Sequence, residues 1–550
     1  MVRAIPEMRR QFRSAVSRMV HYLTPISLAG NTGSSGIFGR FSRRTDCCAP
    51  SPLSQKSIGG CCTLTGGMAS YKSMACHSFV LTARWLPGAL LSRSVWALPF
   101  ALLVSSGTCA PGAAAAQETL AFPGAEGFGR FASGGRGGDV YTVTNLNDSG
   151  PGSLREGFRS ANGPRTVVFG GSGTIQLMSK LLLDRSNITI AGQTAPGDGI
   201  ALRDYTFQIS HATNVIVRYL RLRLGDQNKP RGVRGGDDTF NTEHIDRVIV
   251  DHCSLSWAID GTHDLRHGGN FTMQWSIISE ALNNSLHNKG AHAMAASYRS
   301  PTGSISLHHN LYSTCRDRHP TLGSANEPPQ FIIDFRNNVI YNWSDGGTAN
   351  FCDHFINCIN NLWLPGPMTD PAKLPIAMKG SLPDMAKGHM EGNVFETRAD
   401  LTRDNYAALD FHRWLHEGSN YKYRGTLADW KVNKAVDLGA DTPQTQSAAE
   451  AAELVLAQAG ASLHRDAVDQ RVINNVRQRR GRVVDSQQEV GGWPALRSLP
   501  AAVDSDHDGM PDEWEKSHGL NPNDPTDRNG VRNGDGYTNL EKYLNSLCRP

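Results

Sequence analysis

The sequence predicts an all-β protein built as a parallel β-helix, with a partly helical C-terminal extension and a small calcium-loop module. Short segments rich in Val and Ile recur along the chain, and an Asn falls at a similar place in most of them. Most intervals between these Asn residues span roughly 23–32 residues, a period typical of solenoid proteins. The glycine content, 56 residues, favours a turn-rich β architecture over a helical one. The marker residues are Asn187, Asn214, Asn270, Asn310, Asn338, Asn361 and Asn393.

The recurring Asn has a physical role in such a fold. Asn tolerates the left-handed conformation of a sharp corner, and amides stacked from coil to coil can hydrogen-bond. The alternative is an ordinary β-sandwich with Asn-containing turns. Asn-Gly hairpin turns do not join the strand segments, which favours the solenoid.

The first 116 residues are not expected to fold as a domain. They end in an apolar run, Val95–Val104, and a small-residue stretch, Ala113–Ala116. A positive flank before such a run is typical of a secretory signal peptide, with cleavage near Ala116. We therefore expect a mis-called start, with initiation at Met68 or Met74, although a genuine N-terminal extension is the alternative. The run is too short for a confident membrane span, so a secreted chain without stable membrane insertion is expected.

The cysteines and the net charge carry little functional information. Six of the 11 cysteines lie in residues 1–116, and no CxxC pair suggests zinc. Cys352 and Cys358 are candidates for a disulfide if the compartment is oxidising. The formal charge of +4 gives no indication of a nucleic-acid partner, and we expect a monomer.

Three segments are expected after the leader. Residues 117–400 contain the recurring strand segments and are expected to form the β-helix. Residues 401–497 are expected to form a helical or irregular extension. Within that extension, SAAEAAELVLAQAGA and DAVDQRVINNVRQRRG each predict a helix, and we expect this region to cover the outside of the solenoid.

Residues 498–550 form the third segment, which contains DSDHDGMPDEWE. It has the spacing of a 12-residue calcium loop, with Gly509 at position 6 and acids at positions 1, 3, 5, 9 and 12. Pro511 makes it closer to a dockerin-like or thrombospondin-type variant than to a regular EF-hand. The alternative is a merely acidic linker. The predicted ligands are Asp504, Asp506, Asp508, Asp512 and Glu515.

Four carboxylates gather at the centre of the chain. GGDDTF supplies Asp237 and Asp238, and DGTHD supplies Asp260 and Asp264. Strands one coil apart stack at about 4.8 Å, so acids on neighbouring coils can share an ion. Oxygen ligands point to Ca²⁺ and not to zinc. The alternative is that these are turn aspartates bonded to backbone amides.

Strong cations follow the acids. Lys289 lies in HNKG, and Arg316 and Arg318 lie in RDRHP. Acids that gather Ca²⁺, placed beside cations, suit a site that acts on a polyanion. A surface arginine and a solvated lysine are the alternatives.

Residues 120–400 resemble the pectate lyases of polysaccharide lyase family 1. The resemblance is carried by the opening AFPGAEGFGRFASGGRGGDVY, the DH of Asp251–His252, and the order of Asp cluster, Lys-Gly and Arg-x-Pro. GASLHRDAVDQRV and DSQQEVGGWP are similar to the tails of bacterial members. The resemblance implies a right-handed parallel β-helix.

It also implies site roles. Calcium ligands would be Asp238, Asp260 and Asp264, with Asp237 as a neighbour. Lys289 would contact substrate, and Arg318 would be the catalytic base. The chain departs from the pattern where Thr321 replaces a second arginine after the proline and Gly236 replaces an acid. Arg316 is the candidate for the missing positive charge.

The implied reaction is calcium-dependent β-elimination on 4-linked galacturonan, an acidic polysaccharide. Ca²⁺ and Lys289 would bind the uronate carboxylate and acidify the C5 proton, which Arg318 would remove. Because a guanidinium is normally protonated, this role would favour alkaline pH. Two alternatives stay open: a glycoside hydrolase acting on pectin through paired carboxylates, and a non-catalytic carbohydrate-binding solenoid.

Overall fold

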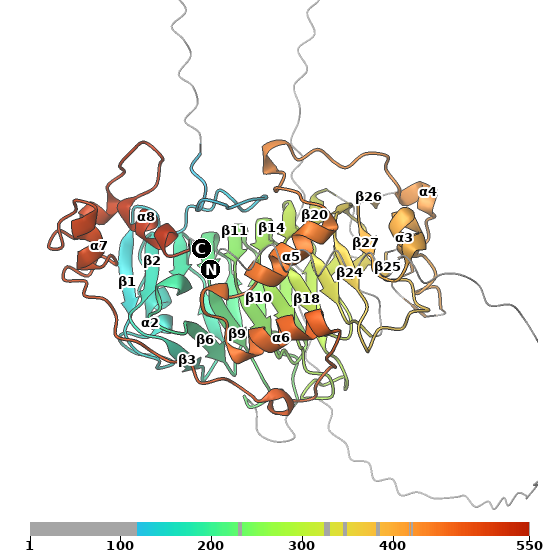
Figure 1. Cartoon of the computed structure of the whole chain (residues 1–550), viewed down its shortest axis with the longest axis horizontal. Helices are drawn as coiled ribbons and strands as arrows, with labels where there is room; N and C mark the ends of the chain where they lie inside the picture. Colours follow the sequence, from blue (N-terminus) through green and yellow to red (C-terminus); the bar gives the residue numbers. More distant parts are fainter. Residues whose placement is uncertain are drawn as a thin grey trace, which may run out of the picture. The chain divides into compact units, whose positions relative to one another are not determined.

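The computed structural model describes residues 118–228, 234–323, 330–344, 349–380, 386–416, 418–419 and 422–548. They belong to one unit, Thr108–Pro550. Its centre is a right-handed parallel β-helix of three sheets (Figure 1). The leader predicted for residues 1–116 lies outside the described residues.

Sheet A runs along one face of the solenoid. Its strands, in spatial order, are β1 (Asp139–Val143), β2 (Arg165–Phe169), β5 (Ile188–Ala191), β8 (Thr213–Arg218), β11 (Asp246–Asp251), β14 (Gly269–Gln274), β17 (Ile305–His308), β20 (Ile332–Arg336), β23 (Phe355–Ile359) and β26 (Lys387–Glu391).

Sheet B forms the second face. Its strands are β3 (Gly173–Gln176), β6 (Ile200–Arg203), β9 (Leu220–Arg223), β12 (Ser254–Ser256), β15 (Ile277–Ser279), β18 (Leu311–Ser313), β21 (Val339–Tyr341), β24 (Leu362–Leu364) and β27 (Val394–Phe395).

Sheet C forms the third face and carries the residues discussed below. Its strands are β4 (Leu181–Leu183), β7 (Phe207–Ser210), β10 (Phe240–Glu243), β13 (Gly261–Arg266), β16 (Met294–Arg299), β19 (Thr321–Leu322), β22 (Ala349–Phe351), β25 (Ile376–Met378) and β28 (Leu409–Asp410).

The α-helices lie outside the coils. They are α2 (Leu154–Arg159), α3 (Ala399–Arg403), α4 (Leu427–Trp430), α5 (Ala448–Gln458), α6 (Ala467–Gln478), α7 (Asp512–Ser517) and α8 (Asn539–Ser546). Short 3-10 turns are η1 (Gly192–Thr194), η2 (Asn405–Ala408), η3 (Gly439–Asp441), η4 (Ser462–His464), η5 (Gln487–Val490) and η6 (Asp527–Asn529). Among the described residues, no helix has the length and hydropathy of a membrane span.

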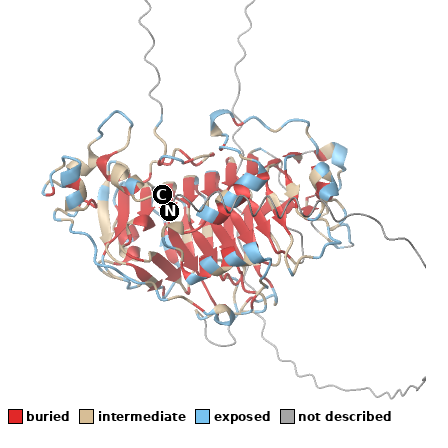
Figure 2. Ribbon diagram, in the orientation of Figure 1, coloured by how far each residue is buried: buried red, intermediate tan, exposed pale blue. Residues whose placement is uncertain are grey.

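Stacked side chains fill the interior of the solenoid. Phe207 stacks on Phe240 with ring centroids 5.3 Å apart, and Phe240 stacks on His263 at 4.9 Å. Each ring sits one coil above the last because parallel strands keep a fixed register, in which Phe240 pairs with Phe207 and with His263. The buried residues follow the strands through the whole length of the solenoid (Figure 2).

Four of the seven marker residues form the predicted Asn ladder, at the corner between sheets A and B. The other three, Asn187, Asn214 and Asn270, lie instead at or directly before the start of strands of sheet A. The Nδ2 group of Asn310 donates to Oδ1 of Asn338. Nδ2 of Asn338 donates in turn to Oδ1 of Asn361, and Nδ2 of Asn361 donates to Oδ1 of Asn393. The left-handed residue at this corner is the one before each ladder residue, for example Asn337, with φ 53°. Corner conformation and side-chain ladder are therefore divided between two adjacent positions.

Both helices predicted for the C-terminal extension are confirmed, and they cover the outside of sheet B. Val455 of α5 and Val476 of α6 join a buried cluster with Ile277 and Leu311, which point outward from β15 and β18. The helices therefore complete the apolar packing of a sheet face that would otherwise be exposed to water.

A buried ion pair fixes the start of α6. Asp466, its N-cap residue, accepts from Arg223 of β9 at 2.9 Å. Asp469 accepts from the same guanidinium at 3.0 Å.

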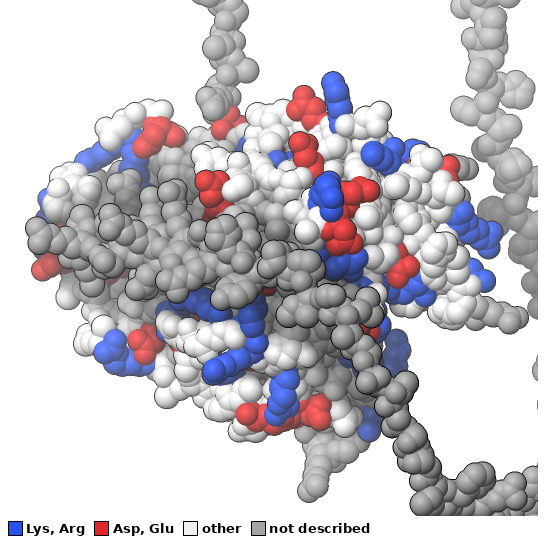
Figure 3. Space-filling view, turned by 45° about the vertical axis from the view of Figure 1, so that its right-hand side comes forward, with Lys and Arg blue, Asp and Glu red and all other residues white. Residues whose placement is uncertain are grey.

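The disulfide considered between Cys352 and Cys358 is not formed. Both are buried free thiols, as are Cys253 and Cys315. The sulfur of Cys358 contacts Oδ1 of Asn393 inside the ladder corner. On the visible surface, acidic and basic side chains are interspersed, in keeping with the small net charge (Figure 3).

Candidate active site

Four consecutive coils bring the predicted site residues to one edge of sheet C. Asp237 and Asp238 precede β10, Asp260 directly precedes β13, and Asp264 lies within it. The Lys289 loop precedes β16, and the segment with Arg316 and Arg318 precedes β19. Asp264 pairs in register with Asn241 of β10 and Ser297 of β16. Because adjacent parallel strands lie about 4.8 Å apart, these segments form a continuous surface.

Asp238 and Asp264 face each other across Gly261. The Gly261 amide donates to Oδ1 of Asp238 at 2.9 Å. A Cβ added to Gly261 would lie 2.8 Å from Oδ1 of Asp264 and 3.1 Å from Oδ1 of Asp238. Burial and the charges of Asp264 and Asp260 raise the pKa of Asp238 well above its usual value. The protein surroundings alone therefore disfavour the charged form of Asp238.

Two arginines neutralise one side of Asp264. Its Oδ2 accepts from Arg299 at 2.7 Å and lies 3.5 Å from Arg266. Its Oδ1 is buried and has no hydrogen-bond partner among the described residues. One carboxylate oxygen of Asp264 therefore remains for a ligand.

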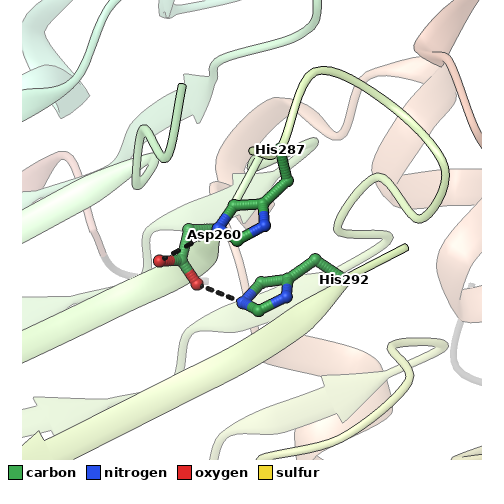
Figure 4. Close-up of side chains that lie close together, drawn as sticks. All are labelled: Asp260, His287 and His292. Atoms are coloured by element: carbon green, nitrogen blue, oxygen red, sulfur yellow. Dashed lines mark ion pairs between the residues drawn. The ribbon is translucent and has the colours of Figure 1, made fainter. Parts of the chain in front are cut away.

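Two histidines hold Asp260 (Figure 4). Nε2 of His292 lies 2.7 Å from Oδ1 of Asp260, and Nε2 of His287 lies 3.7 Å from its Oδ2. The two imidazole rings stack with centroids 3.7 Å apart. Burial alone would raise the pKa of Asp260, but the hydrogen bond and charge of His292 and the charge of Arg318 lower it to about 2.

These histidines were not anticipated from the sequence. The ligand atoms of Asp260, His287 and His292 all lie within 4.8 Å of one another. Gly236, where the resemblance leads us to expect an acid, adjoins them: a Cβ there would lie 3.5 Å from Nε2 of His287, in ordinary van der Waals contact. His287 and His292 are the first and last residues of HNKGAH, and this pair of histidines beside Lys289 is the sequence signal that could have indicated them.

The loop that carries Lys289 is anchored to the strand segment beside the acids. Gly235 donates to the carbonyl of Leu286 at 2.9 Å and accepts from the amide of Asn288 at 3.0 Å. The amide of Lys289 donates to Nδ1 of His287 at 3.2 Å. Lys289 itself is exposed, so its ammonium group is available at the surface.

Arg318 faces Asp260, whereas the guanidinium of Arg316 is bonded elsewhere. Nη1 of Arg318 lies 3.8 Å from Oδ1 of Asp260. Arg318 has φ 62°, and its carbonyl accepts from Ala296 of β16 at 2.8 Å. Nη1 of Arg316 donates to the carbonyl of Ala291 at 3.1 Å. Among the acids, Oδ2 of Asp237 accepts from Nδ2 of Asn228 at 3.3 Å.

The C-terminal module contains a second acidic cluster. The ligand atoms of Asp504, Asp506 and Asp508 lie within 4.8 Å of one another. Asp508 also forms such a group with Glu515 and Asp527. Burial and the neighbouring acids raise the pKa of Asp508 and of Glu515 to about 7.

The cluster differs from the predicted ligand set at two residues, Asp512 and Asp527. The carboxylate of Asp512 accepts from the amide and hydroxyl of Ser505, at 2.8 and 2.9 Å. Asp527, outside the 12-residue loop, lies in the cluster although it was not predicted.

Comparisons with known proteins give close sequence relatives, although no family model matches the chain. Probable pectate lyase C of Aspergillus fumigatus is 35% identical over 440 residues, covering 79% of this chain and 95% of the relative. The protein of the same name from Emericella nidulans is 35% identical over 431 residues, covering 78% and 93%. Pectate lyase 3 of Ambrosia artemisiifolia is 29% identical and covers 28% of this chain and 43% of the relative.

Solved structures give a more distant likeness. The major allergen from cedar pollen has a TM-score of 0.43 at 16% identity, covering 61% of this chain and 92% of the allergen. Pectate lyase C from Erwinia chrysanthemi has a TM-score of 0.40 at 13% identity, covering 63% and 98%.

The β-helix and the sequence relatives define the class of protein, a polysaccharide lyase. Within that class, the chain belongs to the pectate lyase family, as the extent of the match to the two fungal relatives shows. The hydrolase and the non-catalytic binding protein considered from the sequence are therefore set aside.

Proposed function

We propose that this protein cleaves 4-linked galacturonan, or pectate, by calcium-dependent β-elimination. The observation that carries this proposal is the position of Arg318, whose Nη1 faces Oδ1 of Asp260 at 3.8 Å, on the same edge of sheet C as the carboxylates at β10 and β13. A strong cation and a group of acids at one edge of sheet C suit a substrate that bears a carboxylate on each sugar.

The carboxylates fit a calcium ion. Asp238, Asp260 and Asp264 offer oxygen donors, as Ca²⁺ prefers, and Oδ1 of Asp264 has no partner among the described residues. A divalent cation here would favour the charged form of Asp238, whose pKa is raised by burial and by the charges of Asp264 and Asp260. An ion held by these three residues would supply positive charge that stabilises the uronate carboxylate. Asp237 borders this set and completes the proposed metal site.

Three cationic side chains would bind the substrate and remove its proton. Exposed Lys289 would bind the substrate carboxylate, and Arg316 would contact a neighbouring sugar unit. Arg318 would take the proton from C5. The C5–H electron pair then forms the double bond between C4 and C5, the C4–O bond breaks, and the leaving oxygen takes a proton from water. Stabilising the carboxylate as charge develops on it lowers the barrier to proton removal.

His287 and His292 would act as positioning residues. They contact Asp260 and hold its carboxylate in one orientation, as outer partners of metal ligands commonly do.

The localisation, partner, oligomeric state and domain division of the enzyme are proposed from the sequence. Secretion through the leader in residues 1–116, an acidic polysaccharide as partner and a monomeric state remain proposals. So does the division into a catalytic solenoid at 117–400, an extension at 401–497 and a calcium module at 498–550. In that module, the loop from Asp504 to Glu515 is a second proposed calcium site.

Ultraviolet absorbance of unsaturated uronides tests the proposed reaction. Polygalacturonate is incubated with the protein in Ca²⁺ or in EGTA. We expect absorbance to rise in Ca²⁺ and to stay at baseline in EGTA. Equal rates in both conditions would contradict calcium dependence, and sugar release without new absorbance would contradict elimination.

A further inference from the structure

The acidic cluster of the C-terminal module has buried carboxylate oxygens without partners. Glu515 is 0% exposed, and neither of its carboxylate oxygens has a hydrogen-bond partner among the described residues. Asp508 is 1% exposed, and its Oδ2 also has no hydrogen-bond partner among the described residues. Oδ2 of Asp506 and Oδ1 of Asp527 are also unpartnered there. A buried charge that lacks a partner is costly, so these oxygens indicate a cation ligand.

The loop is shaped around this cluster. Asp504 accepts from the amides of Asp508 and Gly509, at 3.2 and 3.0 Å. Gly509 has φ 92°, and a Cβ there would lie 3.1 Å from Val140 of β1. Glycine at this position therefore serves both the turn and the close approach of the loop to the solenoid.

Asp527 joins the cluster from a separate turn that is bonded to the solenoid. It begins η6, whose Arg528 and Asn529 both donate to the carbonyl of Gly138 at 3.3 Å. Gly138 directly precedes β1. The carbonyl of Asp527 accepts from Asn539, the first residue of α8, at 2.7 Å. An ion held by Asp527 would thus join the loop, α8 and the edge of sheet A.

Apolar packing places the module on the first strands of sheet A. Met510, Leu540 and Leu544 are buried against Val168 of β2 and Ala191 of β5. An ion pair between Arg136 and Glu541, at 2.8 Å, lies beside this contact. In Figure 1, α7 and α8 lie at the β1 and β2 end of the solenoid.

We propose that one Ca²⁺, bound by Asp504, Asp506, Asp508, Glu515 and Asp527, fastens the C-terminal module to the first strands of sheet A. This inference rests on the proposed calcium loop and adds Asp527 and a function: the ion holds the end of the chain against the start of the solenoid. Carboxylate ligands at this density select a hard divalent cation. Without the ion, five acids repel one another and the apolar surface around Val168 is less firmly covered.

Terbium luminescence tests the ligand set. Trp514 of α7 lies next to Glu515 in the chain and can sensitise bound Tb³⁺. The full-length protein carries Asp260→Asn and Asp264→Asn, so that the active-site acids do not contribute. We expect Asp527→Asn and Glu515→Gln to weaken Tb³⁺ binding by roughly tenfold or more, and Asp512→Asn to leave it unchanged. Binding unaffected by Glu515→Gln would overturn the calcium loop itself.

Hydrogen exchange tests the fastening. We expect EGTA to accelerate amide exchange in β1, β2 and α8, and Asp527→Asn to show the fast exchange even in Ca²⁺. Asp512→Asn should behave as the wild type. Loss of Tb³⁺ binding with unchanged exchange in β1 and β2 would overturn the fastening while leaving the calcium loop intact. Because neither readout is activity, both results are independent of the proposed lyase reaction.

Discussion

Nε2 of His292 lies 2.7 Å from Oδ1 of Asp260, so an imidazole holds a carboxylate that we propose as a calcium ligand. Arg318 faces the same oxygen at 3.8 Å. The proposed base and the proposed metal site therefore share one carboxylate, and a change in its orientation should affect both.

Replacing His292 by alanine should weaken calcium activation. The carboxylate of Asp260 would lose its fixed orientation, and outer partners of metal ligands typically contribute 10–100-fold in affinity. We expect the Ca²⁺ concentration for half-maximal activity to rise by roughly tenfold, with activity largely restored at saturating Ca²⁺. His244→Ala, at an exposed position on the solenoid, is the control. An unchanged calcium requirement would show that His292 does not position Asp260.

Gly261→Ala should damage the metal site directly. The added Cβ would lie 2.8 Å from Oδ1 of Asp264 and 3.1 Å from Oδ1 of Asp238, so one of the two carboxylates must move. We expect a calcium requirement raised by roughly tenfold. Gly163→Ala is the matched control, because no heavy atom of the described residues lies within 4 Å of a Cβ there. If both variants titrate with Ca²⁺ like the wild type, the gap at Gly261 has no role in binding the ion.

Stability should fall when the solution is acidified. Burial lowers the pKa of His309 from 6.5 to about 4, and it lowers the pKa of neighbouring His308 well below 6.5. Between about pH 6.5 and pH 4 the unfolded chain binds protons at these sites and the folded chain does not. Each histidine should therefore reduce the free energy of unfolding by up to about 1.4 kcal/mol per pH unit in this range.

Urea unfolding at several pH values measures this slope. His309→Gln removes one of the two groups. The free energy of unfolding should then fall less steeply with pH, by up to about 1.4 kcal/mol per pH unit, the contribution of one proton. His412→Gln, at an exposed position, should not change it. A free energy of unfolding that stays constant from pH 7 to pH 5 would contradict the prediction.

Asn338→Ala should destabilise the solenoid without altering its chemistry. Nδ2 of Asn338 donates to the carbonyl of Leu307 at 2.9 Å and to Asn361 at 3.0 Å, and its Oδ1 accepts from the amide of Asn310 at 3.0 Å. Removing it leaves several buried groups unpaired, which should cost about 3 kcal/mol in the free energy of unfolding. Exposed Asn162→Ala is the control, and denaturant unfolding is the measurement. A loss no larger than that of the control would mean that the ladder does not stabilise the fold.

The fold could be predicted because its signals are local and repeated. Asn338 and Asn361 recur at the coil spacing, and each bonds to the next as the stacking argument expects. The two helices of the extension were also recognisable, since α6 begins at an Asp cap and shows one apolar face. The acids around Gly261 could be selected because residues one coil apart must meet in a parallel solenoid.

What could not be predicted depends on loops whose paths are set by tertiary contacts. His287 reaches Asp260 only because its loop bonds to Gly235, a contact that no local pattern encodes. Asp527 reaches the C-terminal cluster because η6 bonds to Gly138, whereas Asp512 bonds to Ser505. The free thiols Cys352 and Cys358 likewise belong to different sheets, because Cys352 directly follows β22 of sheet C and Cys358 lies in β23 of sheet A.

The initial rate of unsaturated uronide formation by Arg318→Lys tests the central claim most directly. Lysine retains the charge but not the geometry of the guanidinium, and loss of a general base typically costs 10²–10⁴-fold in rate. With saturating Ca²⁺ and polygalacturonate, we expect a reduction of about 10²–10⁴-fold, against no change for Arg247→Lys at an exposed site paired with Glu118. A rate for Arg318→Lys within a few-fold of the wild type would contradict the assignment of Arg318 as the base.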